Sequence, residues 1–343
     1  MDIFKRLNET SSYSTAALQV ILGAWVLAAP FERSQKVCLE TGDVPEEDYD
    51  KRSIYSLLYS LYGSVGEVRS ETGERYEFTF NTWGYAWPSA WGPSPTASTD
   101  PQRFGKNAYT GLFAFPQAKD YVQERGGKVH VVELGCGTGA GAHLICKHVL
   151  PEATYQAVDM QLAAIRTCRR KFVPELRGRL TATHGDATRV SIKPGTADFV
   201  AVCETHVTEF AGVVTAEDKA FFQAAHRALK PGGMLTWGNA IPDSTWQPCF
   251  DYLASIGMRL VECRDVTPEA ISARDQDAAR ISAYANQCID KFAGFRIPVL
   301  GSKKRVEARI ALENFSRNPG TSLYNRMVDR TDTYRVALLE KVA

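Results

Sequence analysis

The chain has 343 residues, of which 44% are hydrophobic, so it can bury a large core and could form one large domain with additions or two small ones. Its 40 basic and 39 acidic residues leave a net charge of +1, so the chain lacks the strong positive charge of a protein that binds nucleic acid or anionic lipid. The eight cysteines include no C-x-x-C pair and no zinc-like spacing with histidine, so we expect reduced thiols, a cytoplasmic location and no metal.

The N-terminal stretch from Ser11 to Phe31 contains no charged residue and is apolar on nearly every side between Ala16 and Ala29. A helix here would lack a solvent-facing side, so another surface must cover it. We expect a buried helix or one at a homodimer interface. Membrane association of residues 11–31 is the alternative, although the stretch falls short of the about 20 apolar residues that a membrane span needs. We assign residues 1–75 to a helical N-terminal extension.

An aromatic segment, Asn81-Thr-Trp-Gly-Tyr-Ala-Trp87, precedes a proline-rich run. Aromatic side chains on such a loop either cover a bound ligand or form an ordinary packed cluster, and the sequence leaves both interpretations open. Residues 102–124 are expected to form one helix that leads into the next strand.

A valine-rich run within 129–134 ends at three alternate glycines, Gly135, Gly137 and Gly139. This predicts a buried parallel strand, a turn that approaches a ligand, and a helix that begins near Ala140. Glu133 lies two residues before the first glycine, where a carboxylate suits a cationic ligand and repels a pyrophosphate. Gly135-x-Gly137-x-x-Ala140 also fits the dinucleotide fingerprint loosely, which leaves a nicotinamide-dependent oxidoreductase as an alternative.

Alternating strand and helix patterns continue after the glycines. The predicted elements are strands at Thr154–Asp159, Leu180–His184, Ala197–Glu204 and Met234–Gly238, with helices at Glu217–Leu229 and Trp246–Ile256. Asp159 lies 20 residues beyond Gly139, the separation at which a carboxylate can accept both ribose hydroxyls. Met160 follows where a side chain would pack on an adenine. The series predicts an open parallel sheet with its ligand site at the carboxyl ends of the strands.

Chemistry is expected at the end of the fourth strand, where the sequence reads Cys203-Glu204-Thr205-His206. His206 is the candidate general base, because an imidazole can take a proton from a hydroxyl at neutral pH. A structural histidine is the alternative. Glu204 is expected to orient His206 or to hold an acceptor ammonium.

The pattern Glu-x-Gly-x-Gly-x-Gly at 133–139 resembles the first motif of class I S-adenosylmethionine-dependent methyltransferases, and Gly185-Asp186-Ala187 resembles their adenine-edge motif. The resemblance implies a Rossmann-like α/β sheet of seven strands, the last antiparallel, with further strands at Met258–Asp265 and Thr333–Leu339. It implies S-adenosyl-L-methionine as cofactor and no metal. The implied cofactor contacts are Glu133, Gly135, Cys136, Gly137, Gly139, Asp159, Met160, Gly185, Asp186, Ala187, Cys203, Trp83 and Tyr85.

The chain also resembles the phthiotriol and phenolphthiocerol dimycocerosate methyltransferases in three features: Glu204-Thr205-His206, the aromatic segment and a helical insert before the last strand. In those enzymes the aromatic segment is a flap over cofactor and substrate. The resemblance implies a methyltransferase domain over residues 76–343. Within it, residues 267–330 form an insert that would cover the substrate, and we expect helices in this insert at 267–295 and 306–315. Candidates to line an apolar acceptor pocket are Tyr284, Phe292, Phe295, Phe315 and Tyr324. We expect O-methylation of a small apolar natural product or lipid. Carbon or nitrogen methylation, and a non-catalytic cofactor-binding scaffold, are the alternatives.

Overall fold

The computed structural model describes residues 67–69, 75–77, 79–80, 82–205, 212–294, 313 and 317–342. The N-terminal apolar helix predicted at 11–31, with the homodimer and membrane interpretations attached to it, lies outside the described residues. Among the helices that are described, none is both long and apolar enough to cross a bilayer.

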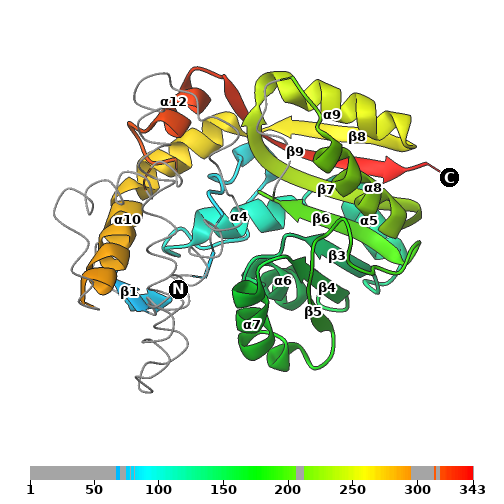
Figure 1. Cartoon of the computed structure of the whole chain (residues 1–343), viewed down its shortest axis with the longest axis horizontal. Helices are drawn as coiled ribbons and strands as arrows, with labels where there is room; N and C mark the ends of the chain where they lie inside the picture. Colours follow the sequence, from blue (N-terminus) through cyan, green and yellow to red (C-terminus); the bar gives the residue numbers. More distant parts are fainter. Residues whose placement is uncertain are drawn as a thin grey trace, which may run out of the picture.

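A seven-stranded sheet forms the centre of the molecule (Figure 1). Its strands in spatial order are β5 (Leu180–His184), β4 (Thr154–Asp159), β3 (His130–Leu134), β6 (Ala197–Cys203), β7 (Leu229–Pro242), β9 (Asp332–Lys341) and β8 (Met258–Asp265). The first five are parallel, whereas β9 runs antiparallel to both of its neighbours. This confirms the predicted Rossmann-like sheet with an antiparallel last strand. Strand order reverses between β3 and β6, where such sheets bind ligands.

Helices cover both faces of the sheet. One face carries α4 (Arg103–Gly111), α5 (Pro116–Glu124), α6 (Ala140–Leu144) with its π-helical continuation η3 (Ile145–Val149), and α7 (Leu162–Lys171). The other carries α8 (Ala216–Ala228) and α9 (Asp243–Ser255). Because side chains alternate along a strand, Val131 of β3 packs into the first layer and Val132 into the second.

Residues 102–124 form two helices, so the prediction of a single helix was wrong. α4 ends at Gly111 and α5 begins at Pro116. Phe115 has the extended conformation (φ −68°, ψ 135°) that a residue before proline favours. Proline is well suited to the first position of a new helix, so Pro116 starts α5 and prevents a single helix from running through Phe115.

Strand β7 begins at Leu229, earlier than the predicted start at Met234. Leu229 pairs with Ala197, and the parallel pairing resumes with Met234 opposite Phe199. Residues 230–233 therefore form an irregularity inside a longer strand.

The elements outside the sheet gather at one end of the molecule (Figure 1). They are α10 (Thr267–Gly294), α12 (Ser322–Val328) and a hairpin of β1 (Glu67–Arg69) and β2 (Arg75–Glu77), while η2 (Ser89–Trp91) and η4 (Pro174–Leu176) are short 3-10 turns. α10 contacts β1, α12 and β9. It matches the first predicted helix of the insert, whereas the second, at 306–315, lies outside the described residues apart from residue 313. The hairpin of β1 and β2 was not predicted from the sequence.

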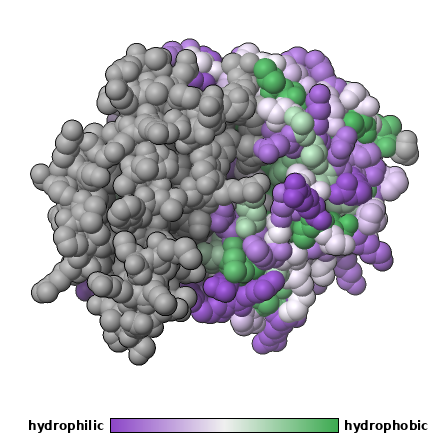
Figure 2. Space-filling model, viewed as in Figure 1, coloured by the Kyte–Doolittle hydropathy of each residue, from purple (hydrophilic) through white to green (hydrophobic). Residues whose placement is uncertain are grey.

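On the face shown in Figure 2, apolar residues are scattered among polar ones over the described part of the chain. Two large apolar side chains that remain exposed, Met160 (42%) and Leu162 (38%), are near neighbours just beyond the end of β4. This exposed apolar surface lies at the carboxyl edge of the sheet, where the ligand site was predicted.

Candidate functional site

Strand β4 holds the glycine loop that follows β3. The peptide N–H groups of Gly135 and Cys136 both donate to the carbonyl of Val158, at 2.8 and 2.9 Å. The N–H of Gly137 donates to Asp159 Oδ2 at 2.8 Å. Three consecutive N–H groups of the loop are thus used inside the protein.

Glycine is required in this loop both by conformation and by space. Gly135, Gly137 and Gly139 have φ values of +82°, +54° and +82°, in the region that favours glycine. A Cβ on Gly135 would lie 2.2 Å from Cγ2 of Thr205, and one on Gly139 would lie 2.3 Å from Sγ of Cys168. Only glycine lets the loop pack this closely against β6 and α7.

Glu133 lies fully buried in the layer beneath the loop. Its Oε2 accepts a hydrogen bond from the Tyr155 hydroxyl at 2.9 Å, whereas Oε1 is buried with no partner among the described residues. Burial raises the pKa of this carboxyl to about 7, the charge of Asp159 adds to the rise, and the hydroxyls of Tyr155 and Tyr109 oppose it. A buried carboxylate oxygen without a donor is a feature that a nearby cationic ligand would stabilise.

Asp159 ends β4 and links the loop to the next turn. Its Oδ1 accepts from the N–H of Gln161 at 2.7 Å, and its Oδ2 accepts from Gly137. Burial raises the pKa of Asp159, and these two backbone hydrogen bonds lower it. Met160 follows with its side chain exposed. The structure thus places the predicted ribose and adenine residues side by side.

Asp186 lies after β5 and stabilises its own turn. Its Oδ1 accepts from both the N–H and the hydroxyl of Thr188, at 2.9 and 2.7 Å. The N–H of Gly185 donates to the carbonyl of Asp159 at 3.0 Å, and Ala187 is half-buried. The structure therefore brings the predicted cofactor residues of β3, β4 and β5 together at one edge.

Glu204 follows Cys203 at the end of β6, and its carboxylate is already occupied. It accepts the N–H of Trp83 at 2.6 Å, the N–H of Gly84 at 2.8 Å and the hydroxyl of Tyr334 at 2.7 Å. We call residues 82–87 the strap, since they cross from β6 to α4 and α10. Burial raises the pKa of Glu204, and its hydrogen-bond donors lower it. His206, the partner that the sequence suggested, lies outside the described residues.

The strap is bound along its length rather than hanging free. The Trp83 carbonyl accepts from the guanidinium of Arg274, and the Tyr85 carbonyl accepts from Asn107 Nδ2 at 3.1 Å. The Tyr85 ring is fully buried and packs edge-on against Tyr334, with ring centroids 5.3 Å apart. Tyr85, predicted to contact cofactor, thus lies in the core, whereas Trp83 is half-buried.

Two residues of this region, Thr205 and Arg274, were not among the predicted site residues. Thr205 donates its hydroxyl to the carbonyl of Gly135 at 3.1 Å and so joins β6 to the glycine loop. Arg274, 2% exposed, lies on the apolar stripe of α10 that also contains Ala270 and Ala273. Helical spacing of alanines around an arginine could have indicated a buried cation.

Several predicted residues cannot be placed. His206 and Asn81 lie outside the described residues, as do the side chains of Phe292, Phe295 and Phe315. Of the other candidates for an acceptor pocket, Tyr284 is buried, and the Tyr324 hydroxyl donates to Asp275 Oδ1 at 2.6 Å.

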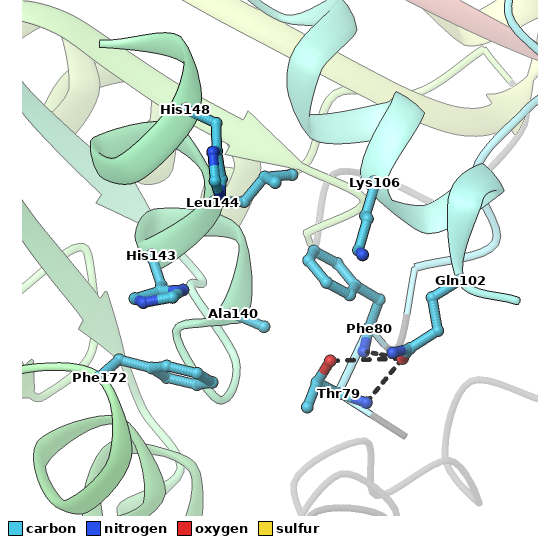
Figure 3. A pocket seen from close by; sticks show the side chains of 9 residues that line it. All are labelled: Thr79, Phe80, Gln102, Lys106, Ala140, His143, Leu144, His148 and Phe172. Carbon is cyan, nitrogen blue, oxygen red and sulfur yellow. Dashed lines mark hydrogen bonds between the residues drawn. The ribbon is translucent and has the colours of Figure 1, made fainter. Parts of the chain in front are cut away.

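A separate cavity of about 230 Å³ lies between α4 and α6 (Figure 3). It is lined by Thr79, Phe80, Gln102, Lys106, Ala140, His143, Leu144, His148 and Phe172. Two of its three basic side chains pair with acids outside the lining, Lys106 with Asp100 and His143 with Glu175. The cavity therefore offers little net charge to a ligand, and Asp159 and Asp186 take no part in it.

In the part of the chain that the structure describes, no group of three or more His, Cys, Asp or Glu side chains is placed to hold a metal ion.

The strand order, the glycine loop on β3 and the acid that ends β4 together define a class I methyltransferase fold. Residues 131–233 match the family model described as a methyltransferase domain. The chain therefore contains a class I S-adenosylmethionine-dependent methyltransferase domain.

A stretch of 145 residues is 26% identical to a phthiotriol/phenolphthiotriol dimycocerosates methyltransferase of Mycobacterium ulcerans (strain Agy99), over 42% of this chain and 52% of that protein. The chain thus spans about half the length of this curated relative. The solved cyclase SpnF aligns with a TM-score of 0.52 and 14% identity over 84% of this chain and 94% of its own. A structure described as a putative sarcosine dimethylglycine methyltransferase from Galdieria sulphuraria aligns with a TM-score of 0.50 and 14% identity. The alignment covers 70% of this chain and 86% of that one. Both share the fold.

Proposed function

We propose that this protein transfers the methyl group of S-adenosylmethionine to a hydroxyl of a small apolar natural product or lipid. The proposal rests on the internal hydrogen bonds of the glycine loop. A pyrophosphate needs loop N–H groups that are free to donate, but those of residues 135–137 already donate to β4. It would also meet the carboxyl groups of Glu133 and Asp159, whereas a cation would meet the unpaired Oε1 of Glu133.

The residues at this edge fit each part of the cofactor. Glu133 would stabilise its positive charge, Asp159 would accept from the ribose hydroxyls, and Asp186 would accept from the adenine amino group beside Met160. When bound, S-adenosylmethionine supplies a methyl group activated by a sulfonium. The chain then has mainly to align the acceptor, and His206 would take the hydroxyl proton.

The class of acceptor is supported by the balanced charge of the chain and by the Mycobacterium ulcerans relative, whose name denotes triols. We assign this chemistry to residues 76–343, with 267–330 as the substrate cover. The hairpin of β1 and β2 crosses the boundary at residue 75. Because a cyclase shares the fold, catalysis of methyl transfer must be tested directly.

A thermal-shift comparison of S-adenosylhomocysteine with NAD tests the ligand class. The true ligand stabilises the fold by RT ln(1 + [L]/Kd), which is about 2.7 kcal/mol at 100 times Kd. We expect S-adenosylhomocysteine alone to raise Tm. A rise with NAD alone would instead identify an oxidoreductase.

Transfer of labelled methyl from S-adenosylmethionine into apolar alcohols tests the reaction. His206→Ala should keep S-adenosylhomocysteine affinity and lose turnover of the alcohol. Unchanged turnover would remove His206 as the base, and label found on carbon or nitrogen would replace O-methylation by the corresponding alternative.

A further inference from the structure

Two adjacent residues at the end of β6 join three separate parts of the molecule. The carboxylate of Glu204 accepts two N–H groups of the strap and the hydroxyl of Tyr334 in β9. The next residue, Thr205, donates to the carbonyl of Gly135 in the glycine loop. The loop, the strap and β9 are thus all bonded to one dipeptide.

The backbone of Glu204 has a conformation that is uncommon for a residue with a side chain. Its φ is +48°, although its N–H still donates to the carbonyl of Gly238 in β7 at 2.7 Å. Such conformations persist where the surroundings enforce them, and they are frequent at functional sites. Here the turn lets the residue remain bonded to the sheet while its carboxylate reaches the strap.

The strap is held from its other side by cations. Arg274 donates to the carbonyl of Trp83, the residue whose N–H Glu204 binds. The guanidinium of Arg317 lies 4.5 Å from the centre of the Trp83 ring. Both arginines are buried, at 2% and 4% exposure. An anion on one side and cations on the other therefore fix the position of Trp83.

We propose that Glu204 is a positioning residue that fastens the strap to the end of β6, so that cofactor binding at the glycine loop and ordering of the strap are coupled through Thr205 and Glu204. This inference rests on the proposed function, because it assigns the strap to the site of S-adenosylmethionine.

The fastening depends on the negative charge of Glu204. Hydrogen bonds to a carboxylate are about twice as strong as those to a neutral acceptor, so protonation weakens both bonds to the strap. Among the described residues, the charged or titratable groups that face Glu204 are Arg274, Tyr334, Tyr85 and Cys203. Burial raises the pKa of the Glu204 carboxyl, so the strap should loosen at a higher pH than an exposed glutamate would allow.

Hydrogen exchange of the full-length chain at the Trp83 and Gly84 amides tests this proposal, between pH 5 and 8 and with or without S-adenosylhomocysteine. Glu204→Gln removes the charge and turns one acceptor into a donor. We expect exchange at both amides to rise about 10- to 100-fold in this variant, the effect of losing a hydrogen bond to a charged group. After correction for intrinsic rates, wild-type exchange should rise as the pH falls, and that dependence should vanish in the variant.

Glu340→Gln is the matched control, because it neutralises a half-buried carboxylate of β9 that pairs with Arg259 rather than with the strap. It should leave strap exchange and its pH dependence unchanged. S-adenosylhomocysteine should protect the strap amides in the wild type and in the control but not in Glu204→Gln. Equal exchange in wild type and Glu204→Gln, or equal protection by the ligand, would overturn the proposal.

Failure of the proposed function gives a different result. In that case S-adenosylhomocysteine would not bind the wild type at all. The wild-type pH series without ligand would still decide whether Glu204 fastens the strap, even if Glu204→Gln did not fold.

Discussion

Replacing Glu133 by glutamine should remove a pH dependence of stability that arises beneath the glycine loop. The Glu133 carboxyl is fully buried, and burial raises its pKa from 4.5 to about 7. Between these two values the folded chain holds a proton that the unfolded chain has lost, so the free energy of unfolding falls as the pH rises. From pH 5 to pH 8, the contribution of Glu133 to the free energy of unfolding falls by about 2.5 kcal/mol.

Urea denaturation of both proteins at pH 5, 6, 7 and 8 measures this effect. The stability of Glu133→Gln relative to the wild type should increase by about 2.5 kcal/mol across the series. Other groups, such as His130 with its lowered pKa, titrate in both proteins and cancel in the difference. A difference that stays constant with pH would show that Glu133 does not titrate in this range and would refute the reasoning.

Three further substitutions test other contacts. Tyr85→Phe removes a buried hydroxyl that has no partner among the described residues, so the free energy of unfolding should rise by about 1 kcal/mol in urea. Weaker binding of S-adenosylhomocysteine would instead show that the hydroxyl serves the cofactor. Asp159→Asn removes the charge that accepts from Gly137, and calorimetry should give an S-adenosylhomocysteine Kd at least about 10-fold higher, whereas an unchanged Kd would exclude this residue from the site. Arg317→Met removes one of two arginines that bond Asp332 and should cost about 3 kcal/mol in urea denaturation, so a loss below about 1 kcal/mol would contradict a structural role.

Most of the sheet could be predicted because each strand is encoded locally. Thr154–Asp159 and Leu180–His184 were predicted with the bounds that the structure has, since a short run of strand-forming residues ends at a turn in each case. The break before Pro116 was not predicted, although proline favours an extended residue before it. The hairpin of β1 and β2 was not predicted either, because its three-residue strands carry no periodicity.

The candidate site was less predictable, because its partners are distant in the sequence. Glu204 was chosen for its place at the end of β6, but its hydrogen-bond donors Trp83 and Tyr334 lie 121 and 130 residues away. No local pattern specifies such pairings. Similarly, Glu133 was chosen for its place before the first glycine, and no local pattern specifies the packing of Tyr109 and Tyr155 around its carboxyl.

The internal hydrogen bonds of the glycine loop also bear on the kinetics of ligand exchange. Because β4 already fixes residues 135–137, an arriving molecule loses little conformational entropy in ordering them. Association should then approach the rate of diffusional encounter, and affinity should be set mainly by how slowly the complex dissociates. A pre-ordered loop of this kind therefore favours fast loading of the cofactor, whereas the dissociation rate decides how long the cofactor is held.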